Sequence, residues 1–269
     1  MGDLTTYEKE ALLQKLRVKW IFNSNAIEGN TLTEGETSFI IENGLTVQGK
    51  SLSEHQQVLG HVKALDLIYG MLETDVVSEE DLFALHKAIQ TEHLIDSERP
   101  NGAYKVIANG RWINIEGKDK HSYYPHPDDV AHLMDLWFKE YGNVAQKIDS
   151  KEEAISIYAD MHIAFAAIHP FYDGNGRLAR LVANLPLLKN NYLPIIIDST
   201  RRATYIDLLS TYNLHSPTLD ANTTKLIEKN DAYLNLIDFF TQEYTNSEKI
   251  LDALRESTAE LEKSRSSRR

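Results

Sequence analysis

The sequence contains no cysteine, which excludes disulfide bonds and thiol catalysis and leaves the redox compartment open. It has no run of about 18 or more apolar residues, so no membrane span is predicted. The first residues show no basic region followed by an apolar core, which argues against a secretory signal. These absences favour a cytoplasmic protein that has no membrane partner.

Basic residues are scarce, because 28 Lys and Arg stand against 40 Asp and Glu and give a formal net charge of −12. Nucleic-acid binding rests on neutralising many phosphates, so this balance predicts no nucleic-acid partner. A local basic site is still compatible with the composition. At 269 residues and 42% hydrophobic content, the chain is large enough to bury a full core.

Apolar residues recur at helical spacing along most of the chain, which predicts a mostly helical, all-α fold. A loop rich in Gly, Asn and Thr is expected at 23–37. Ser78 followed by three acidic residues is typical of a helix start. The expected helices cover 7–22, 53–73, 78–94, 128–141, 151–168, 177–190, 201–213 and 222–244, and an apolar face at 247–262 precedes a polar tail.

The stretch between residues 99 and 127 differs, because Gly and Pro separate short β-prone runs. Asn109-Gly110 lies between two such runs, and Asn-Gly is the strongest short-range signal for a hairpin turn. We therefore expect a β-hairpin within residues 102–125, with its turn at Asn109-Gly110. An isolated hairpin is marginally stable unless it packs on something or accepts a partner strand.

Twelve residues from His169 to Arg180, HPFYDGNGRLAR, connect two of the expected helices. Gly174 and Gly176 permit backbone conformations closed to other residues and let the main chain approach a ligand. Successive N–H groups in such a turn, together with the start of the next helix, favour a bound anion. The motif therefore predicts a phosphate-binding turn.

The charged side chains of this motif suit a nucleotide. Arg177 and Arg180 are three residues apart and share one helical face, where two guanidinium groups suit a di- or triphosphate. Asp173 is a candidate Mg²⁺ ligand, since Mg²⁺ usually binds one or two carboxylates plus substrate phosphates. His169 is a candidate general base for an incoming hydroxyl. A plain connection between helices would explain each residue alone but not their combination.

Other motifs fit less well. Residues 174–179 match a dinucleotide-binding fingerprint in their letters, but they follow a helix rather than a strand. The zinc-protease pattern HExxH does not occur.

The twelve residues resemble the signature of Fic-domain proteins, HPFx[DE]GNGRxxR, with every fixed position filled, and the resemblance extends over roughly residues 20–215. It implies a helical Fic fold with a hairpin flap before the motif. It also implies transfer of AMP from ATP to a hydroxyl side chain of a target protein, with His169 as general base and Asp173 as Mg²⁺ ligand. The other motif residues would bind phosphates: Gly174, Asn175 and Gly176 in an anion hole, Arg177 at the β-phosphate and Arg180 at the γ-phosphate.

A second resemblance lies upstream, where Ser24-Asn-Ala-Ile-Glu28-Gly29-Asn30 is similar to the family's inhibitory motif, [ST]xxxE[GN]. In members that carry it, the glutamate pairs with the second motif arginine and blocks a productive γ-phosphate pose. Glu28 would then pair with Arg180, which removes a phosphate clamp and adds repulsion against the triphosphate. Considered alone, Glu28 could equally be a capping or surface acid.

Residues 202–213 resemble the part of the family that closes over the adenine. Tyr205 could stack on the base or could be a core aromatic on an amphipathic helix, and the sequence does not choose between them. Asn213 could hydrogen-bond the edge of the base. The hairpin at 102–125 would hold a target segment by strand addition, with its hydroxyl near His169.

The sequence thus predicts an autoinhibited protein adenylyltransferase that uses ATP and Mg²⁺ and modifies a protein target, with itself as one candidate. The alternatives are AMP removal, transfer of another nucleotidyl or phosphoryl group, and a nucleotide-binding regulator without turnover. Residues 1–50 would form the N-terminal helix and inhibitory segment, 51–220 the Fic core, and 221–269 the C-terminal helices and polar tail. The oligomeric state is left open.

Overall fold

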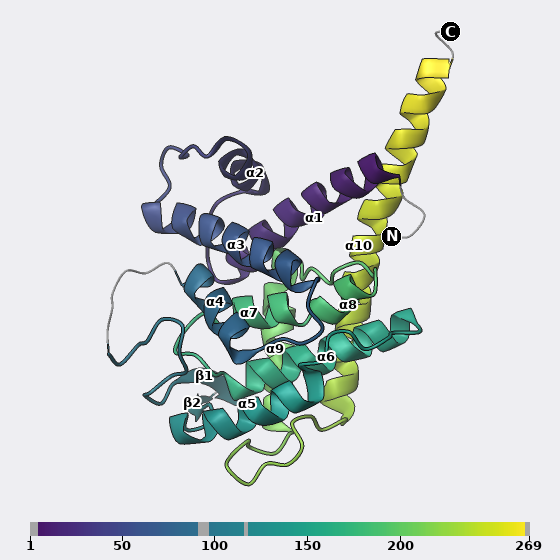
Figure 1. Cartoon of the computed structure of the whole chain (residues 1–269). Helices are drawn as coiled ribbons and strands as arrows, with labels where there is room; N and C mark the ends of the chain where they lie inside the picture. Colours follow the sequence, from purple (N-terminus) through teal and green to yellow (C-terminus); the bar gives the residue numbers. More distant parts are fainter. Residues whose placement is uncertain (1–4, 91–96, 116–117, 267–269) are drawn as a thin grey trace.

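The computed structural model describes residues 5–90, 97–115 and 118–266. These residues are mostly helical with one small sheet, as predicted (Figure 1). In chain order the elements are α1 (Thr6–Ile27), α2 (Glu34–Asn43), α3 (Leu52–Met71), α4 (Glu79–Ile89), β1 (Gly110–Ile115), β2 (Lys118–Tyr123), α5 (Pro127–Tyr141), α6 (Lys151–Ile168), α7 (Asn175–Val182), α8 (Leu185–Lys189), a 3₁₀ turn (Ser199–Arg201), α9 (Arg202–Leu214) and α10 (Asp231–Ser266). Across the described ranges, no helix is long and apolar enough to cross a membrane.

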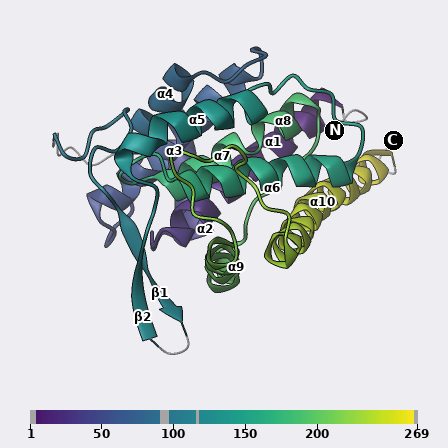
Figure 2. The ribbon, with the colours of Figure 1, turned by 90° about the horizontal axis from the view of Figure 1, so that it is seen from below.

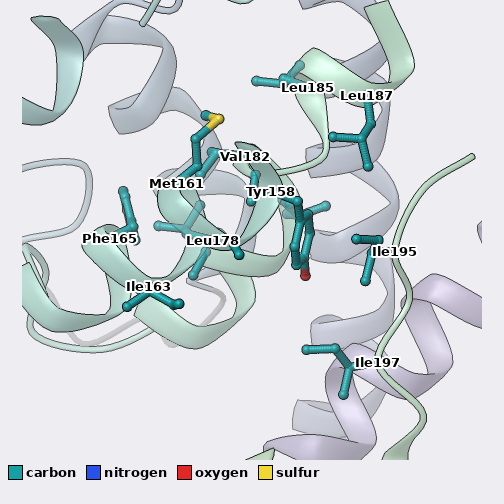
Figure 3. Close-up of a cluster of buried hydrophobic side chains, with 14 of the residues drawn as sticks. Tyr158, Met161, Ile163, Phe165, Leu178, Val182, Leu185, Leu187, Ile195 and Ile197 are labelled. Carbon is teal, nitrogen blue, oxygen red and sulfur yellow. The ribbon is translucent and has the colours of Figure 1, made fainter. Parts of the chain in front are cut away.

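Helix α6 is the centre of the core and is buried around most of its circumference, as expected for a helix enclosed by others. Helices α5, α7, α8 and α10 pack against it. Figure 3 shows Met161 and Phe165 of α6 near Leu178 and Val182 of α7. Burying one such side chain stabilises the fold by about 1.5–3 kcal/mol. This packing fixes both ends of the loop that joins α6 to α7.

Reciprocal caps begin three of the N-terminal helices. At α4, the Ser78 hydroxyl accepts from the Asp81 N–H, and the Asp81 carboxylate accepts from the Ser78 N–H, as the sequence indicated for this helix start. The same arrangement begins α2 and α3. Such caps satisfy N–H groups that a helix start leaves without partners.

The bounds predicted for the N-terminal loop, 23–37, are wrong at both ends. Helix α1 continues to Ile27, and α2 begins at Glu34. Polar residues end the apolar pattern near Asn23, but tertiary contacts keep them helical. The Asn23 side chain accepts from the Ser199 N–H, and Ser24 binds a buried arginine of α7. The helix therefore extends as far as these contacts reach.

In the second half, the helix expected at 177–190 is interrupted where Pro186 predicts a kink. Helix α7 ends at Val182 and α8 starts next to Pro186, because proline lacks the N–H that a continuous helix needs. The C-terminal part forms one helix, since α10 begins at Asp231 and runs unbroken to Ser266. Residues 91–94 of the expected helix 78–94 lie outside the described residues.

The predicted hairpin is present within 102–125, but Asn109-Gly110 is not its turn. Strands β1 and β2 pair antiparallel with Gly110 opposite Tyr123, so Gly110 opens the first strand. The Asn109 amide instead donates to the carbonyls of Phe171 and Tyr172. The connection between the strands, residues 116–117, lies outside the described residues. Figure 2 shows the strands extending away from the helical body.

Candidate active site

The loop between α6 and α7 begins at His169, which ends α6 in a left-handed conformation (φ 53°, ψ 58°). Its N–H donates to the Phe165 carbonyl at 3.0 Å, and Pro170 cannot continue the helix. A left-handed conformation at a residue other than glycine costs energy and persists where the surroundings impose it. This local strain marks His169 as a candidate functional residue.

The His169 imidazole lies flat against the Tyr124 ring, with ring centroids 3.6 Å apart and 5° between the planes. Tyr124 directly follows β2, so the base of the hairpin covers the histidine. Burial lowers the pKa of His169 to about 3, and the positive charges of Lys105 and Arg111 act in the same direction. The imidazole is therefore neutral near pH 7, which is the state that a general base requires.

Helix α7 begins in a way that suits an anion. Gly174 precedes it with a φ of 80°, in the left-handed region that glycine adopts readily. Within the described part of the chain, no side chain caps the start of α7, so its first N–H groups and the helix dipole remain available to a ligand. Asn175 orders the turn, because its side chain accepts from the Phe171 N–H and donates to the Phe171 carbonyl.

Arg177 and Asp173 lie side by side at this helix start. Arg177 Nη2 is 3.5 Å from Asp173 Oδ2, and Arg177 Nη1 donates to the Ile89 carbonyl at the end of α4. The guanidinium is buried, whereas the Asp173 side chain is 58% exposed. The carboxylate is thus open to solvent beside the N–H groups of α7.

Arg180 binds residues at the end of α1, whereas Arg177 binds the end of α4. Arg180 Nε donates to the Ser24 hydroxyl at 3.0 Å, and Nη2 donates to the Ser24 carbonyl at 3.0 Å and to Glu28 Oε1 at 2.6 Å. The side chain is 3% exposed. A buried guanidinium without an anionic partner would be costly, so Glu28 neutralises Arg180 in this structure.

Glu28 lies just beyond the last residue of α1 and reaches the start of α7. A Cβ atom placed on Gly176 would lie only 2.7 Å from Glu28 Oε1, so the carboxylate rests against the glycine turn. Burial acts to raise the pKa of Glu28, but Arg180 outweighs it, with help from Arg177 and Arg202, and the pKa lies below its usual value. The carboxylate is therefore charged at neutral pH. Gly29, with a φ of 99°, turns the chain away after it.

A cavity of about 300 Å³ lies between the base of the hairpin and the end of α9. Arg111 and Tyr124 line its hairpin side, and Tyr212 and Asn213 line its α9 side. Ligand cavities in proteins start at about this volume. Because Tyr124 also stacks on His169, the cavity adjoins the motif loop. The predicted base residue Asn213 therefore lines a space that could hold part of a ligand.

Tyr205 does not line this cavity. It is 2% exposed, its hydroxyl is 2.9 Å from His162 Nε2, and its ring packs beside Phe239. In this position neither face of the Tyr205 ring is open to a nucleotide base. The ring is a core aromatic, which is the second of the two roles that the sequence allowed, and it does not stack on a base from here. Both possibilities produce the same amphipathic spacing, so the sequence could not separate them.

Four residues of the site region were missed by sequence reasoning. Tyr124 covers His169. The other three, His86, Lys105 and Asn109, contact backbone carbonyls of the motif loop. None belongs to a recognisable spacing, and Asn109 was assigned to a turn. Only the fold brings these positions together.

Asp173 is suited to bind a Mg²⁺ ion whose other ligands would come from the substrate and from water. In residues 5–90, 97–115 and 118–266, no group of three or more His, Cys, Asp or Glu side chains is placed to hold a metal. A single exposed carboxylate beside an anion site matches the way in which Mg²⁺ binds through one carboxylate, substrate phosphates and water.

A Fic/DOC family model matches residues 76–187, which include the hairpin and the motif. An erythronolide synthase docking domain model matches residues 245–265 inside α10, outside the site. The protein adenylyltransferases Fic of Culex quinquefasciatus and Drosophila melanogaster are each 31% identical to the chain, over 79% of its length. The chain spans 39% of the length of these curated relatives.

The fold also matches solved structures. A Fic domain containing signaling protein from Bacteroides thetaiotaomicron superimposes with a TM-score of 0.77 and 24% identity, over 93% of this chain and 92% of that one. The likeness covers the arrangement of the helices. It shows that the chain shares this helical fold, and the family model places a Fic/DOC domain at residues 76–187.

Proposed function

We propose that the protein is an autoinhibited protein adenylyltransferase that transfers AMP from ATP to a hydroxyl side chain of a target protein. The observation that carries this proposal is the pairing of a neutral, half-buried His169 with an uncapped helix start five residues further along the chain, at Gly174. A proton acceptor beside an anion site is what nucleotidyl transfer to a hydroxyl needs. The adenylyltransferase names of the relatives support the same reaction.

In this reaction the target hydroxyl oxygen forms a bond to the α-phosphorus while the bond from that phosphorus to the bridging β-phosphate oxygen breaks. His169 accepts the hydroxyl proton, and pyrophosphate leaves. Arg177 and the N–H groups at residues 174–176 would neutralise charge on the phosphates, because positioning and charge stabilisation supply most of the catalysis in such displacements. Mg²⁺ held by Asp173 would add further charge neutralisation.

The cavity beside the hairpin is proposed to take the nucleoside. Asn213 supplies a side-chain amide that can donate to and accept from a base edge. Arg111 and Tyr124 would contact the ligand from the hairpin side. In this proposal the nucleoside would lie next to the anion site, and Tyr205 would not contact it.

The hairpin is proposed to bind the target. Trp112 and Tyr123 are 73% and 68% exposed on its strands, and exposed aromatic side chains are common anchors in protein interfaces. An extended target segment could add to a strand edge through main-chain hydrogen bonds. Since β2 leads directly to Tyr124 over His169, such a segment would bring its hydroxyl toward the base.

Inhibition is proposed to come from Glu28. Its carboxylate holds Arg180 and rests against Gly176, where a terminal phosphate would need both positive charge and space. A triphosphate would therefore meet repulsion and lose one clamp while this ion pair persists. Relief of inhibition requires that Glu28 release Arg180.

The proposal is tested by incubating the Glu28→Gly protein with labelled ATP, GTP, CTP and UTP in a lysate and detecting labelled protein bands. We expect transfer of label from ATP labelled in the α-phosphate, and no transfer in the Glu28→Gly, His169→Ala double variant. ATP binding in calorimetry without any transfer of label would instead support a regulator without turnover. Preference for another nucleotide would contradict ATP as the donor.

A further inference from the structure

Consecutive carbonyl groups of the motif loop, at residues 170 to 173, accept hydrogen bonds from outside the loop. The Lys105 N–H donates to the Pro170 carbonyl at 2.9 Å. The Asn109 side-chain amide donates to the carbonyls of residues 171 and 172, both at 3.1 Å. The His86 ring lies 3.2 Å from the carbonyl of residue 173. The donors come from α4 and from the segment before β1.

His86 has one tautomer that satisfies its surroundings. Its Nδ1 accepts from the Gly102 N–H at 2.8 Å, so the ring proton is on Nε2 and is donated to the Asp173 carbonyl. The ring also stacks on Phe171, with centroids 4.1 Å apart and 8° between the planes. His86 thus fixes the loop through a ring contact and a directed hydrogen bond.

Asn109 is oriented just as firmly. Its Oδ1 accepts from the buried Lys105 ammonium at 2.9 Å, and this leaves the NH₂ side of the amide to face the loop carbonyls. Rotating the amide would place an oxygen against those carbonyls and an NH₂ group against an ammonium. Lys105 therefore fixes the orientation of the Asn109 amide, so that its NH₂ group faces the loop carbonyls.

These contacts determine where the loop N–H groups point. In a trans peptide unit the carbonyl and the following N–H point in opposite directions, and the described residues contain no cis peptide bond. Carbonyls of 171–173 held toward α4 and the hairpin base consequently turn the N–H groups of 172–174 the other way. The first N–H groups of α7 follow directly and extend this row of donors.

We propose that His86 and Asn109 are positioning residues that hold the N–H groups of 172–174 toward the phosphates of the bound nucleotide. The inference rests on the proposed function, since it assigns these groups to the same phosphate site. Neither side chain touches the reacting atoms. They act by fixing the peptide orientation of the loop, and they join it to α4 and to the base of the hairpin.

The test uses the 269-residue chain with His86→Phe or Asn109→Asp in the Glu28→Gly background. His86→Phe keeps a ring against Phe171 but removes both hydrogen bonds, and Asn109→Asp keeps the acceptor for Lys105 but removes the donors. We expect each to weaken MgATP binding in calorimetry by about 10-fold or more, with a parallel fall in kcat/KM, because misplaced donors lose most of their effect.

Matched controls separate positioning from general loss of stability. His55 is also buried and bridges two backbone groups, accepting from the Val47 N–H and contacting the Ser51 carbonyl, so His55→Phe should lower Tm in a similar way while MgATP affinity stays unchanged. Asn101→Asp removes an exposed donor to the Gln90 carbonyl and should likewise leave the affinity unchanged.

The outcomes also distinguish this inference from the proposed function. Unchanged MgATP affinity in both His86→Phe and Asn109→Asp would overturn the positioning role, even if the parent transfers AMP. Nucleotide binding by a parent that labels no protein would refute the adenylyltransferase, while the affinities of the variants would still decide the positioning role. No nucleotide binding by the parent would overturn both.

Discussion

Arg180 and Glu28 are 152 residues apart in the sequence, and their side chains meet at 2.6 Å between Nη2 and Oε1. The arginine belongs to the motif that defines the phosphate site, and the glutamate comes from the end of α1. The guanidinium is buried and has two further contacts with Ser24. One ion pair therefore joins the N-terminal helix to the proposed catalytic loop.

Replacing Glu28 with glycine is expected to raise AMP transfer. A hydrogen bond between charged groups contributes about 1.5–3 kcal/mol, so its loss should increase the fraction of protein that binds ATP productively by roughly 10- to 100-fold. Initial rates with labelled ATP measure the effect. Glu42→Gly, which changes a glutamate of α2 that accepts only from Ser38 among the described contacts, is the control and should leave the rate unchanged.

Ser24→Ala is expected to activate transfer less than Glu28→Gly. The change removes the hydroxyl that accepts from Arg180 Nε but leaves the backbone carbonyl and the carboxylate in place. The cost to the free energy of unfolding should be about 1 kcal/mol, measured by urea denaturation. Ser38→Ala, at a half-buried serine of α2 whose hydroxyl donates to Glu42, should change neither quantity. Activation equal to that of Glu28→Gly would contradict a graded role.

The sequence predicts the parts of the site that are contiguous, and the fold supplies the rest. His169 to Arg180 could be assigned because turn, helix start and phased arginines lie within twelve residues. Asn109 shows the limit, since Asn-Gly chemistry suits a hairpin turn, yet its amide is used by a loop more than sixty residues away. His86 and Tyr205 show the same limit, because amphipathic spacing does not reveal which neighbours a buried side chain meets.

The pH dependence of transfer is expected to reflect the unusual environment of His169. Burial, followed by Lys105 and Arg111, lowers its pKa to about 3, so activity of the Glu28→Gly protein should persist well below pH 6.5 and fall only as the base is protonated. Removing one positive charge by Lys105→Met should raise the pKa of His169 and move the acid limb of the kcat/KM profile to higher pH. Lys139→Met, at an exposed lysine of α5, should leave the limb in place, and a limb near pH 6.5 in the parent would contradict the lowered pKa of His169.

Acid stability offers a test that needs no substrate. His162 is fully buried beneath α9, and burial, followed by Arg180, lowers its pKa to about 3 from an unfolded value of 6.5. Between these values the unfolded chain binds a proton that the folded chain does not, so the free energy of unfolding should fall as pH drops below 6.5, with His162 contributing about 1.4 kcal/mol per pH unit. Urea denaturation from pH 7 to pH 4 should show a smaller slope in His162→Gln than in the parent. Tyr205→Phe breaks the same hydrogen bond but keeps the histidine, so it should lower stability without reducing the slope. A slope unchanged by His162→Gln would mean that the folded protein protonates this histidine as readily as the unfolded chain does.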